Sequence, residues 1–115
     1  MSRRSPAALL QDIVEAIRRI RLYTTDMDYE GFVRDTKTQD AVIRNIEIIG
    51  EAAKNIPEPL KEEHPSIPWK QITGTRDRLI HDYFGANLDI VWQIVDDELS
   101  PLLEGIQKAR QEISA

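Results

Sequence analysis

The segment from Thr75 to Tyr83 gathers the residue types that could carry out chemistry in this chain. Within nine residues it holds two arginines, two aspartates, a histidine and a tyrosine, namely Arg76, Asp77, Arg78, His81, Asp82 and Tyr83. Arginine is the best bidentate donor to phosphate, and the unperturbed pKa of histidine suits proton transfer near neutral pH. This set fits metal-independent cleavage of RNA, in which a base activates the 2′-hydroxyl and cations hold the phosphate.

A solvated helix face is the competing interpretation of the same residues, and motifs of this size often have no function. On a helix, Arg76 and Tyr83 lie within about 20° of each other, whereas His81 is rotated by about 140° from Arg76. The three side chains therefore cannot all point the same way from a straight, exposed helix. Either other helices wall a groove around the segment, or a second chain completes the site.

The elements that must position this segment are helices. Apolar residues repeat every three or four positions along nearly the whole chain, and no segment alternates with the period of two that a strand needs. We therefore predict one all-α domain over residues 1–115, an antiparallel helical bundle in up-and-down order. Its long helices are expected at about 6–23, 36–56, 69–84 and 88–113.

Capping residues mark the starts of three of these helices. Ser5 before Pro6 is a start signal, because serine accepts from free N–H groups and proline suits the first helical position. The sequence TKTQ at 36–39 fits a capping box, in which Gln39 reaches back to the cap. Asn87 can cap the last helix.

The last helix contains a regular seam and one proline. Eight apolar residues alternate four and three positions apart, the spacing of a helix-bundle seam: Leu88, Trp92, Val95, Leu99, Leu102, Ile106, Ala109 and Ile113. Pro101 lies within this helix, and an interior proline removes a helical hydrogen bond, so a kink is expected near Ser100. The proline-rich stretch 58–68 is expected to be a connector with at most one helical turn.

Composition limits the classes of function. The net charge of −5 argues against a general nucleic-acid coat, so a polyanion must be met by a local patch. Arg18, Arg19 and Arg21 could follow an RNA backbone or form a solvated face. The chain has no cysteine, so a cytoplasmic location is the default, and no stretch approaches the roughly 18 apolar residues of a membrane span. No cluster has metal-ligand spacing, and neither a metal nor a cofactor is predicted.

Three motifs follow one another along the chain: IIGEAAK at 48–54, IPW at 67–69 and GTRDRLIHDYF at 74–84. The last contains the pattern R-x4-H-x-Y, which is formed by Arg76, His81 and Tyr83. This pattern resembles the signature of the HEPN superfamily, and the ordered set of motifs is similar to the HepT toxins over essentially the whole chain.

The resemblance implies the ribonuclease toxin of a bacterial or archaeal toxin–antitoxin pair. Members of the family are all-α homodimers whose motifs face each other across the two-fold axis, with Arg76 and His81 as the catalytic pair. The implied partner is a small MntA-type nucleotidyltransferase that transfers AMP units onto Tyr83 and silences the nuclease. A dimer also suits the chemistry, since 2′-hydroxyl attack needs a base and an acid, and the other histidine, His64, lies in the connector.

Weaker candidates surround this motif. Arg78 and Asp82 could contact RNA, but an ion pair between them, four residues apart on one helix, is at least as good an interpretation. Glu51 and Lys54 could support the site or form a structural pair, and we favour the pair slightly. The alternative function is a catalytically inactive helical dimer that binds nucleotide or a partner protein.

Overall fold

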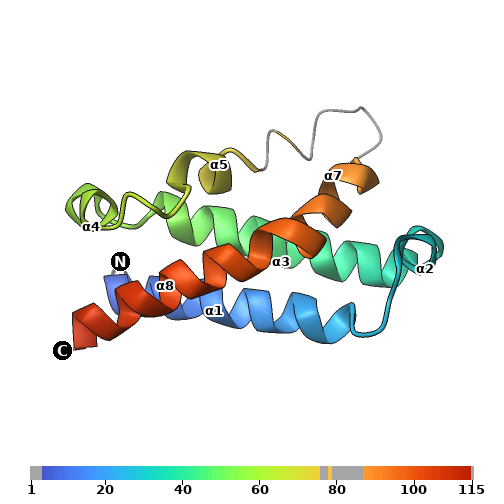
Figure 1. The fold of residues 1–115 in the computed structure, drawn as a ribbon, viewed down its shortest axis with the longest axis horizontal. Coiled ribbons are helices and arrows are strands. Elements are labelled where there is room, and N and C mark those ends of the chain that lie inside the picture. The colour runs from blue at the N-terminus through green and yellow to red at the C-terminus, as the bar shows by residue number, and fades with distance from the viewer. Residues whose placement is uncertain (1–3, 76–77, 79–86, 115) are drawn as a thin grey trace.

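The computed structural model describes residues 4–75, 78 and 87–114, and no strand occurs among them. The elements, shown in Figure 1, are α1 (Pro6–Tyr23), α2 (Tyr29–Arg34), α3 (Thr36–Lys54), α4 (Glu58–Glu63), α5 (Trp69–Thr73), α7 (Leu88–Gln93), the π-helix η1 (Ile94–Glu98) and α8 (Leu99–Ser114). The predicted all-α class is therefore confirmed.

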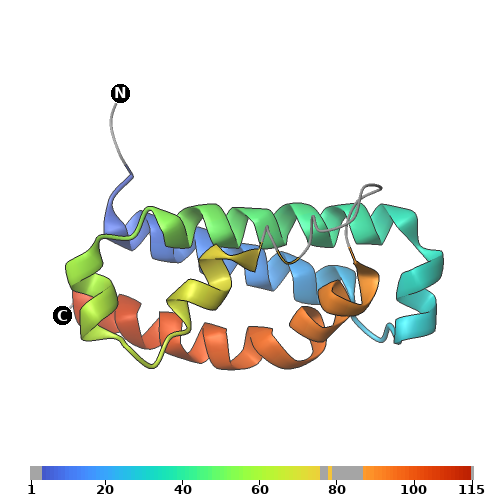
Figure 2. The same ribbon diagram turned by 90° about the horizontal axis from the view of Figure 1, so that it is seen from above.

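The long helices form an antiparallel bundle, as predicted. α1 runs antiparallel to both α3 and α8 and contacts both of them (Figures 1 and 2). The start of α1 and the C-terminus of the chain lie at the same end of the molecule (Figure 1). α4 and α5 lie at one side of this group, and α5 contacts α3.

Aliphatic stripes on α1 and α3 make up much of the core. The repeat of apolar residues every three or four positions is confirmed in these two helices, because the residues that form it are all buried: Leu9, Leu10, Ile13, Ile17 and Ile20 on α1, with Val42, Ile46, Ile49 and Ala53 on α3 and Ile56 just beyond it. Full burial of one such leucine or isoleucine side chain is worth about 1.5–3 kcal/mol. Spacing at three and four positions places each set on one helix face, so the two helices bury those faces against each other.

The helix starts at Ser5 and Asn87 agree with the sequence. The Ser5 hydroxyl accepts a hydrogen bond from the Ala8 amide at 3.1 Å, and Pro6 occupies the first turn. The Asn87 side chain accepts from the amides of Asp89 at 3.0 Å and Ile90 at 3.4 Å. Both caps satisfy amides that have no partner within their helix.

The predicted capping box at the start of α3 is wrong. The cap is Asp35, one residue earlier, whose carboxylate accepts from the amide of Thr38 at 3.0 Å and from its hydroxyl at 2.7 Å. Gln39 does not reach back to a cap. Its buried amide donates to the carbonyls of Phe32 at 2.8 Å and Val33 at 2.9 Å. Gln39 therefore satisfies carbonyls near the end of α2, which a local sequence rule does not anticipate.

Two other helical boundaries differ slightly from expectation. α3 ends at Lys54 and not at residue 56. The connector contains the six-residue helix α4, which is longer than the single turn expected. α4 follows Pro57 and holds Pro59 in its first turn, where a proline fits because its fixed φ suits the helix and it has no N–H to satisfy.

A π-helical turn interrupts the last helix before Pro101. At the end of η1 the Leu99 amide donates to the Ile94 carbonyl, five residues earlier. The irregular backbone thus lies one turn ahead of Ser100, where a kink was expected. Figure 1 shows α7 bent away from the line of α8. A π turn holds one more residue than an α turn, and such turns often occur at functional sites.

The extra residue changes which side chains are buried. Val91 and Ile94 are buried on the N-terminal side of the turn, and Leu99, Leu102, Ile106 and Ala109 on the C-terminal side. The predicted seam is therefore correct from Leu99 to Ala109. Leu88 and Trp92 ahead of the turn and Val95 within it are only half-buried, and at the far end Ile113 is 39% exposed.

Candidate active site

The predicted catalytic segment starts where α5 ends. Its four key residues lie outside the described residues, so their roles stay predictions: Arg76, His81, Asp82 and Tyr83. The structure describes Thr75 immediately before the motif, Arg78 within it and Asn87 after it. These three positions show how the rest of the fold holds the segment.

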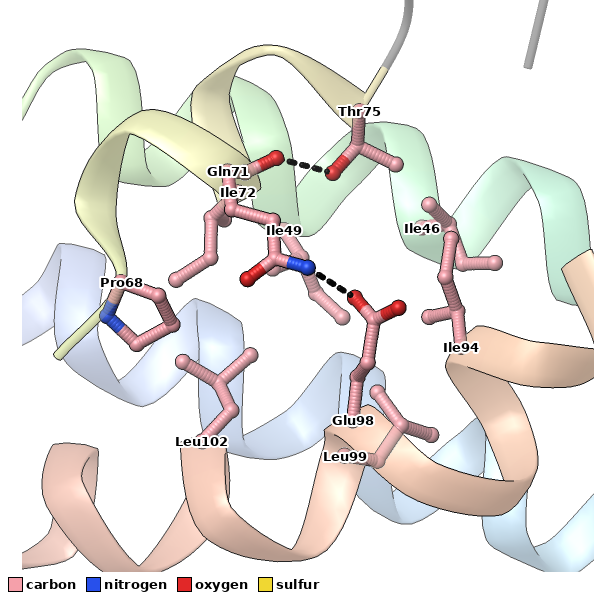
Figure 3. Close-up of a pocket in the computed structure, with 10 residues that line it drawn as sticks. All are labelled: Ile46, Ile49, Pro68, Gln71, Ile72, Thr75, Ile94, Glu98, Leu99 and Leu102. Carbon is pink, nitrogen blue, oxygen red and sulfur yellow. Dashed lines mark hydrogen bonds between the residues drawn. The ribbon is translucent and has the colours of Figure 1, made fainter. Parts of the chain in front are cut away.

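The entrance to the segment is a turn of helix. The Thr75 side chain is buried, and its hydroxyl donates to the Gln71 carbonyl at 2.9 Å (Figure 3). The Gly74 amide donates to the Lys70 carbonyl at 2.9 Å, and the Arg78 amide donates to the Gly74 carbonyl at 3.2 Å. The helix expected over 69–84 is therefore not continuous from its start, because α5 ends at Thr73 with Gly74 as its C-cap. The bond from the Arg78 amide to the Gly74 carbonyl is the next helical hydrogen bond along the described residues.

Arg78 forms a two-pronged ion pair with Glu98 of η1. Its two terminal nitrogens donate to the two carboxylate oxygens at 3.1 and 3.0 Å, and the side chains are 28% and 25% exposed. Gln71 of α5 donates to the same carboxylate at 3.2 Å (Figure 3). The hydrogen bonds to Glu98 raise the pKa of Arg78, with partial burial opposing them. We call Gln71, Arg78 and Glu98 the Glu98 cluster.

Sequence analysis missed Glu98. Arg78 was considered as an RNA contact or as a partner of Asp82, whereas the structure pairs it with an acid twenty residues away. One signal was available: Val91, Ile94 and Glu98 follow at three and four positions, so an acid occupies a place on an apolar helical stripe. A charged residue at such a place usually has a partner.

A small cavity lies beside the Glu98 cluster. It measures about 40 Å³ and its lining, drawn in Figure 3, consists of Ile46, Ile49, Pro68, Gln71, Ile72, Thr75, Ile94, Glu98, Leu99 and Leu102. This volume accommodates water but not a nucleotide. The cavity therefore marks imperfect packing where α5 meets η1, and it is not a substrate pocket.

Glu51 and Lys54 are both exposed on α3. The Glu51 carboxylate accepts from the side-chain amide of Asn55 at 3.4 Å. In the part of the chain that the structure describes, no ion pair joins Glu51 to Lys54, so the structural pair favoured from sequence is not formed.

The arginines of α1 make contacts within the molecule. Arg18 donates to Glu15 at 2.6 Å, and Arg19 lies 4.0 Å from the same carboxylate. Arg21 donates to the Ser100 hydroxyl of α8 at 2.6 Å. These contacts favour the interpretation of a solvated face over a built phosphate site.

His64 links the connector at residues 58–68 to α8. Its buried side chain places Nε2 3.1 Å from the carboxylate of Glu112. Its carbonyl accepts from the indole N–H of Trp69 at 3.0 Å. These contacts give His64 a structural role in the bundle.

Neither a metal-binding cluster nor a membrane-spanning helix occurs within residues 4–75, 78 and 87–114. No group of three or more His, Cys, Asp or Glu in these ranges is arranged to hold a metal ion. Likewise, no helix within them has both the length and the apolar character needed to cross a membrane.

The helical bundle and the order of the motifs define a HEPN-type domain, and comparison with known proteins identifies the family. The model of the family described as "Ribonuclease HepT-like" matches residues 13–109. The chain therefore belongs to the HepT-like ribonuclease family.

Named relatives align with nearly the full length of the chain. "Probable ribonuclease HepT" of Thermococcus cleftensis is 45% identical over 95% of this chain and 99% of its own. "Putative RNase MJ0127" of Methanocaldococcus jannaschii is 42% identical over 98% of this chain and 93% of its own. "Putative RNase TTE0752" of Caldanaerobacter subterraneus is 36% identical over 94% and 96%. No solved structure gives a significant match.

Proposed function

We propose that this protein is a metal-independent endoribonuclease that acts as the toxin of a toxin–antitoxin pair in the cytoplasm. The observation that carries the proposal is the family match across residues 13–109, which spans the R-x4-H-x-Y motif. Within that motif Arg76 supplies a fixed positive charge for the scissile phosphate, and His81 transfers protons. The substrate class is RNA, because the reaction needs a 2′-hydroxyl as nucleophile.

The active form in this proposal is a homodimer with two motifs facing each other. Attack by the 2′-hydroxyl needs a base to remove its proton and an acid to protonate the leaving oxygen. The chain has two histidines, and the contact between His64 and Glu112 engages one of them in the bundle. His81 is then the histidine available for catalysis, and a second copy supplies the second group.

The proposed antitoxin is an MntA-type nucleotidyltransferase that adds AMP to Tyr83. A tyrosyl–AMP group brings negative charge and the bulk of a base into a site meant for the RNA phosphate. The phosphate of the AMP group would bond Arg76 in place of the RNA phosphate, and its charge would repel the substrate. The test is the intact mass after co-expression with the nucleotidyltransferase. Increments of AMP should appear on the wild type and be missing from Tyr83→Phe, and increments that persist in Tyr83→Phe would reject this acceptor.

RNA cleavage by the purified dimer tests the nuclease. The wild type should cut a labelled RNA in the presence of EDTA and leave products that end in a 2′,3′-cyclic phosphate. His81→Ala should lose at least about 100-fold of this activity, the usual scale of general acid–base catalysis. Inhibition by EDTA that magnesium reverses would refute the mechanism. Equal inactivity of both proteins, with equal harmlessness on expression, would favour the catalytically inactive dimer that binds nucleotide or a partner.

A further inference from the structure

Glu98 binds Arg78, the one described residue inside the R-x4-H-x-Y motif. Arg78 follows Arg76 by two positions and precedes His81 by three. A bidentate pair between a guanidinium and a carboxylate fixes orientation as well as distance, because two parallel hydrogen bonds form at once. The backbone amide of Arg78 is also bonded, to the Gly74 carbonyl at 3.2 Å. The chain is thus held at Arg78 by both main chain and side chain.

We propose that Glu98 is a positioning residue, which sets the geometry of Arg76 and His81 through Arg78 and does not touch RNA. The proposal rests on the proposed nuclease function. It assigns Arg78 the role of a tether, because both terminal nitrogens of its guanidinium already bond a carboxylate, whose negative charge opposes a phosphate at the same place.

The π turn explains how Glu98 reaches Arg78. In an uninterrupted α-helix, residue 98 would follow Val91 and Ile94 on the buried face. With one more residue in the turn, Leu99 takes that place in the core, being 2% exposed. Glu98 is left half-buried at the side of η1 that meets α5, where Gln71 and Arg78 contact it (Figure 3). The π turn therefore aims the carboxylate at the catalytic segment.

A purely structural role predicts a different outcome. It predicts a lower Tm with no specific loss of turnover, because removing one partner of a partly buried ion pair leaves the other charge without its partner. A positioning role instead lowers the turnover number, because small misplacement of catalytic groups can cost on the order of 100-fold in rate. The two roles are therefore separated by comparing kcat, KM and Tm in the same variants.

The first experiment compares Glu98→Gln with a matched control. Glu15→Gln removes the charge from another arginine-bonded glutamate, the partner of Arg18, on the surface of α1. Both dimers are assayed on a labelled RNA oligonucleotide and by thermal unfolding. Glu98→Gln should lower kcat by about 10- to 100-fold with KM within about twofold of wild type and Tm nearly unchanged. Glu15→Gln should match wild type. Equal activity of the two variants would overturn the proposal.

A charge swap separates tethering from direct RNA contact. Arg78→Glu alone and Glu98→Arg alone should each lose activity, and the double variant should recover part of it because the pair can re-form with reversed charges. If Arg78 instead binds RNA, Arg78→Glu raises KM and the swap gives no rescue. That result would overturn the proposal.

Amide hydrogen exchange tests the tether between Glu98 and Arg78 independently of ribonuclease activity. In Glu98→Gln, peptides that contain residues 76–86 should exchange faster than in wild type, while Glu15→Gln leaves them unchanged. Unchanged exchange in Glu98→Gln overturns the tether whether or not the protein cuts RNA. Faster exchange in a protein with no ribonuclease activity would support the tether and reject the proposed function.

Discussion

The interface between α1 and α3 differs in kind from the interface between α5 and η1. The first joins two uninterrupted helices through aliphatic stripes, including Ile13 and Ile46. The second contains a π turn, a cavity of about 40 Å³ and the Glu98 cluster. Apolar burial has no preferred direction, whereas hydrogen-bonded charges fix angles. The regular interface therefore supplies stability, and the irregular one fixes the orientation of Arg78 within the predicted catalytic motif.

Deletion of one exposed residue from α3 and, separately, of one from η1 should produce the largest difference in stability between the two regions. Removal of Arg44 from α3 rotates Ile46 and Ile49 by about 100° relative to Val42 and takes them out of the core. Loss of each buried isoleucine costs about 2–5 kcal/mol, so this variant should not fold.

Removal of Asp97 from η1 should be tolerated far better. The five-residue step from Ile94 to Leu99 becomes four, a normal α-helical spacing, and the buried stripe stays in place. The cost should not exceed about 3 kcal/mol, which is the cost of Pro101 within a regular helix. Circular dichroism and urea unfolding measure both deletions. Equal loss of structure in the two variants would contradict the view that η1 is a one-residue insertion.

Gly105→Ala should have an intermediate effect on α8. A Cβ at this position would lie 2.8 Å from Cγ1 of Ile67 in the connector. Overpacking costs about 1–3 kcal/mol, while the gain in helix propensity offsets up to about 1 kcal/mol. We expect a net loss of up to about 2 kcal/mol in the free energy of unfolding. In an Ile67→Ala background the same change should be neutral or stabilising, and a double-mutant cycle without coupling would refute the close approach.

The smallest expected effect concerns the cap of α3. Hydrogen bonds from the amide and hydroxyl of Thr38 lower the pKa of Asp35. A carboxylate with a lowered pKa in the folded state stabilises the fold above its unfolded pKa of about 4, and this contribution is lost as the pH falls through the folded value. Asp35→Asn still accepts a hydrogen bond but does not titrate. Its Tm should therefore decrease less than that of wild type between pH 6 and about pH 3, and parallel Tm curves would contradict this assignment.

The sequence by itself determined the helical class, the stripes of α1 and α3, and the caps at Ser5 and Asn87. These features depend on interactions between residues at most four positions apart, so their spacing is visible in the chain. The family also follows from the sequence, since the motif from Arg76 to Tyr83 is contiguous. The roles of those motif residues remain predictions.

Only the tertiary structure decided the contacts between elements. Gln39 bonds the end of α2, the cap falls on Asp35, and Glu98 reaches Arg78 across twenty residues. The heptad-like spacing from Leu88 to Ile113 suggested one continuous seam, but the π turn moved its first part off the buried face. Periodicity assumes a fixed number of residues per turn. Whether a helix keeps that number depends on how its neighbours pack against it, and here the π turn brings Glu98 to Arg78 of the predicted catalytic segment.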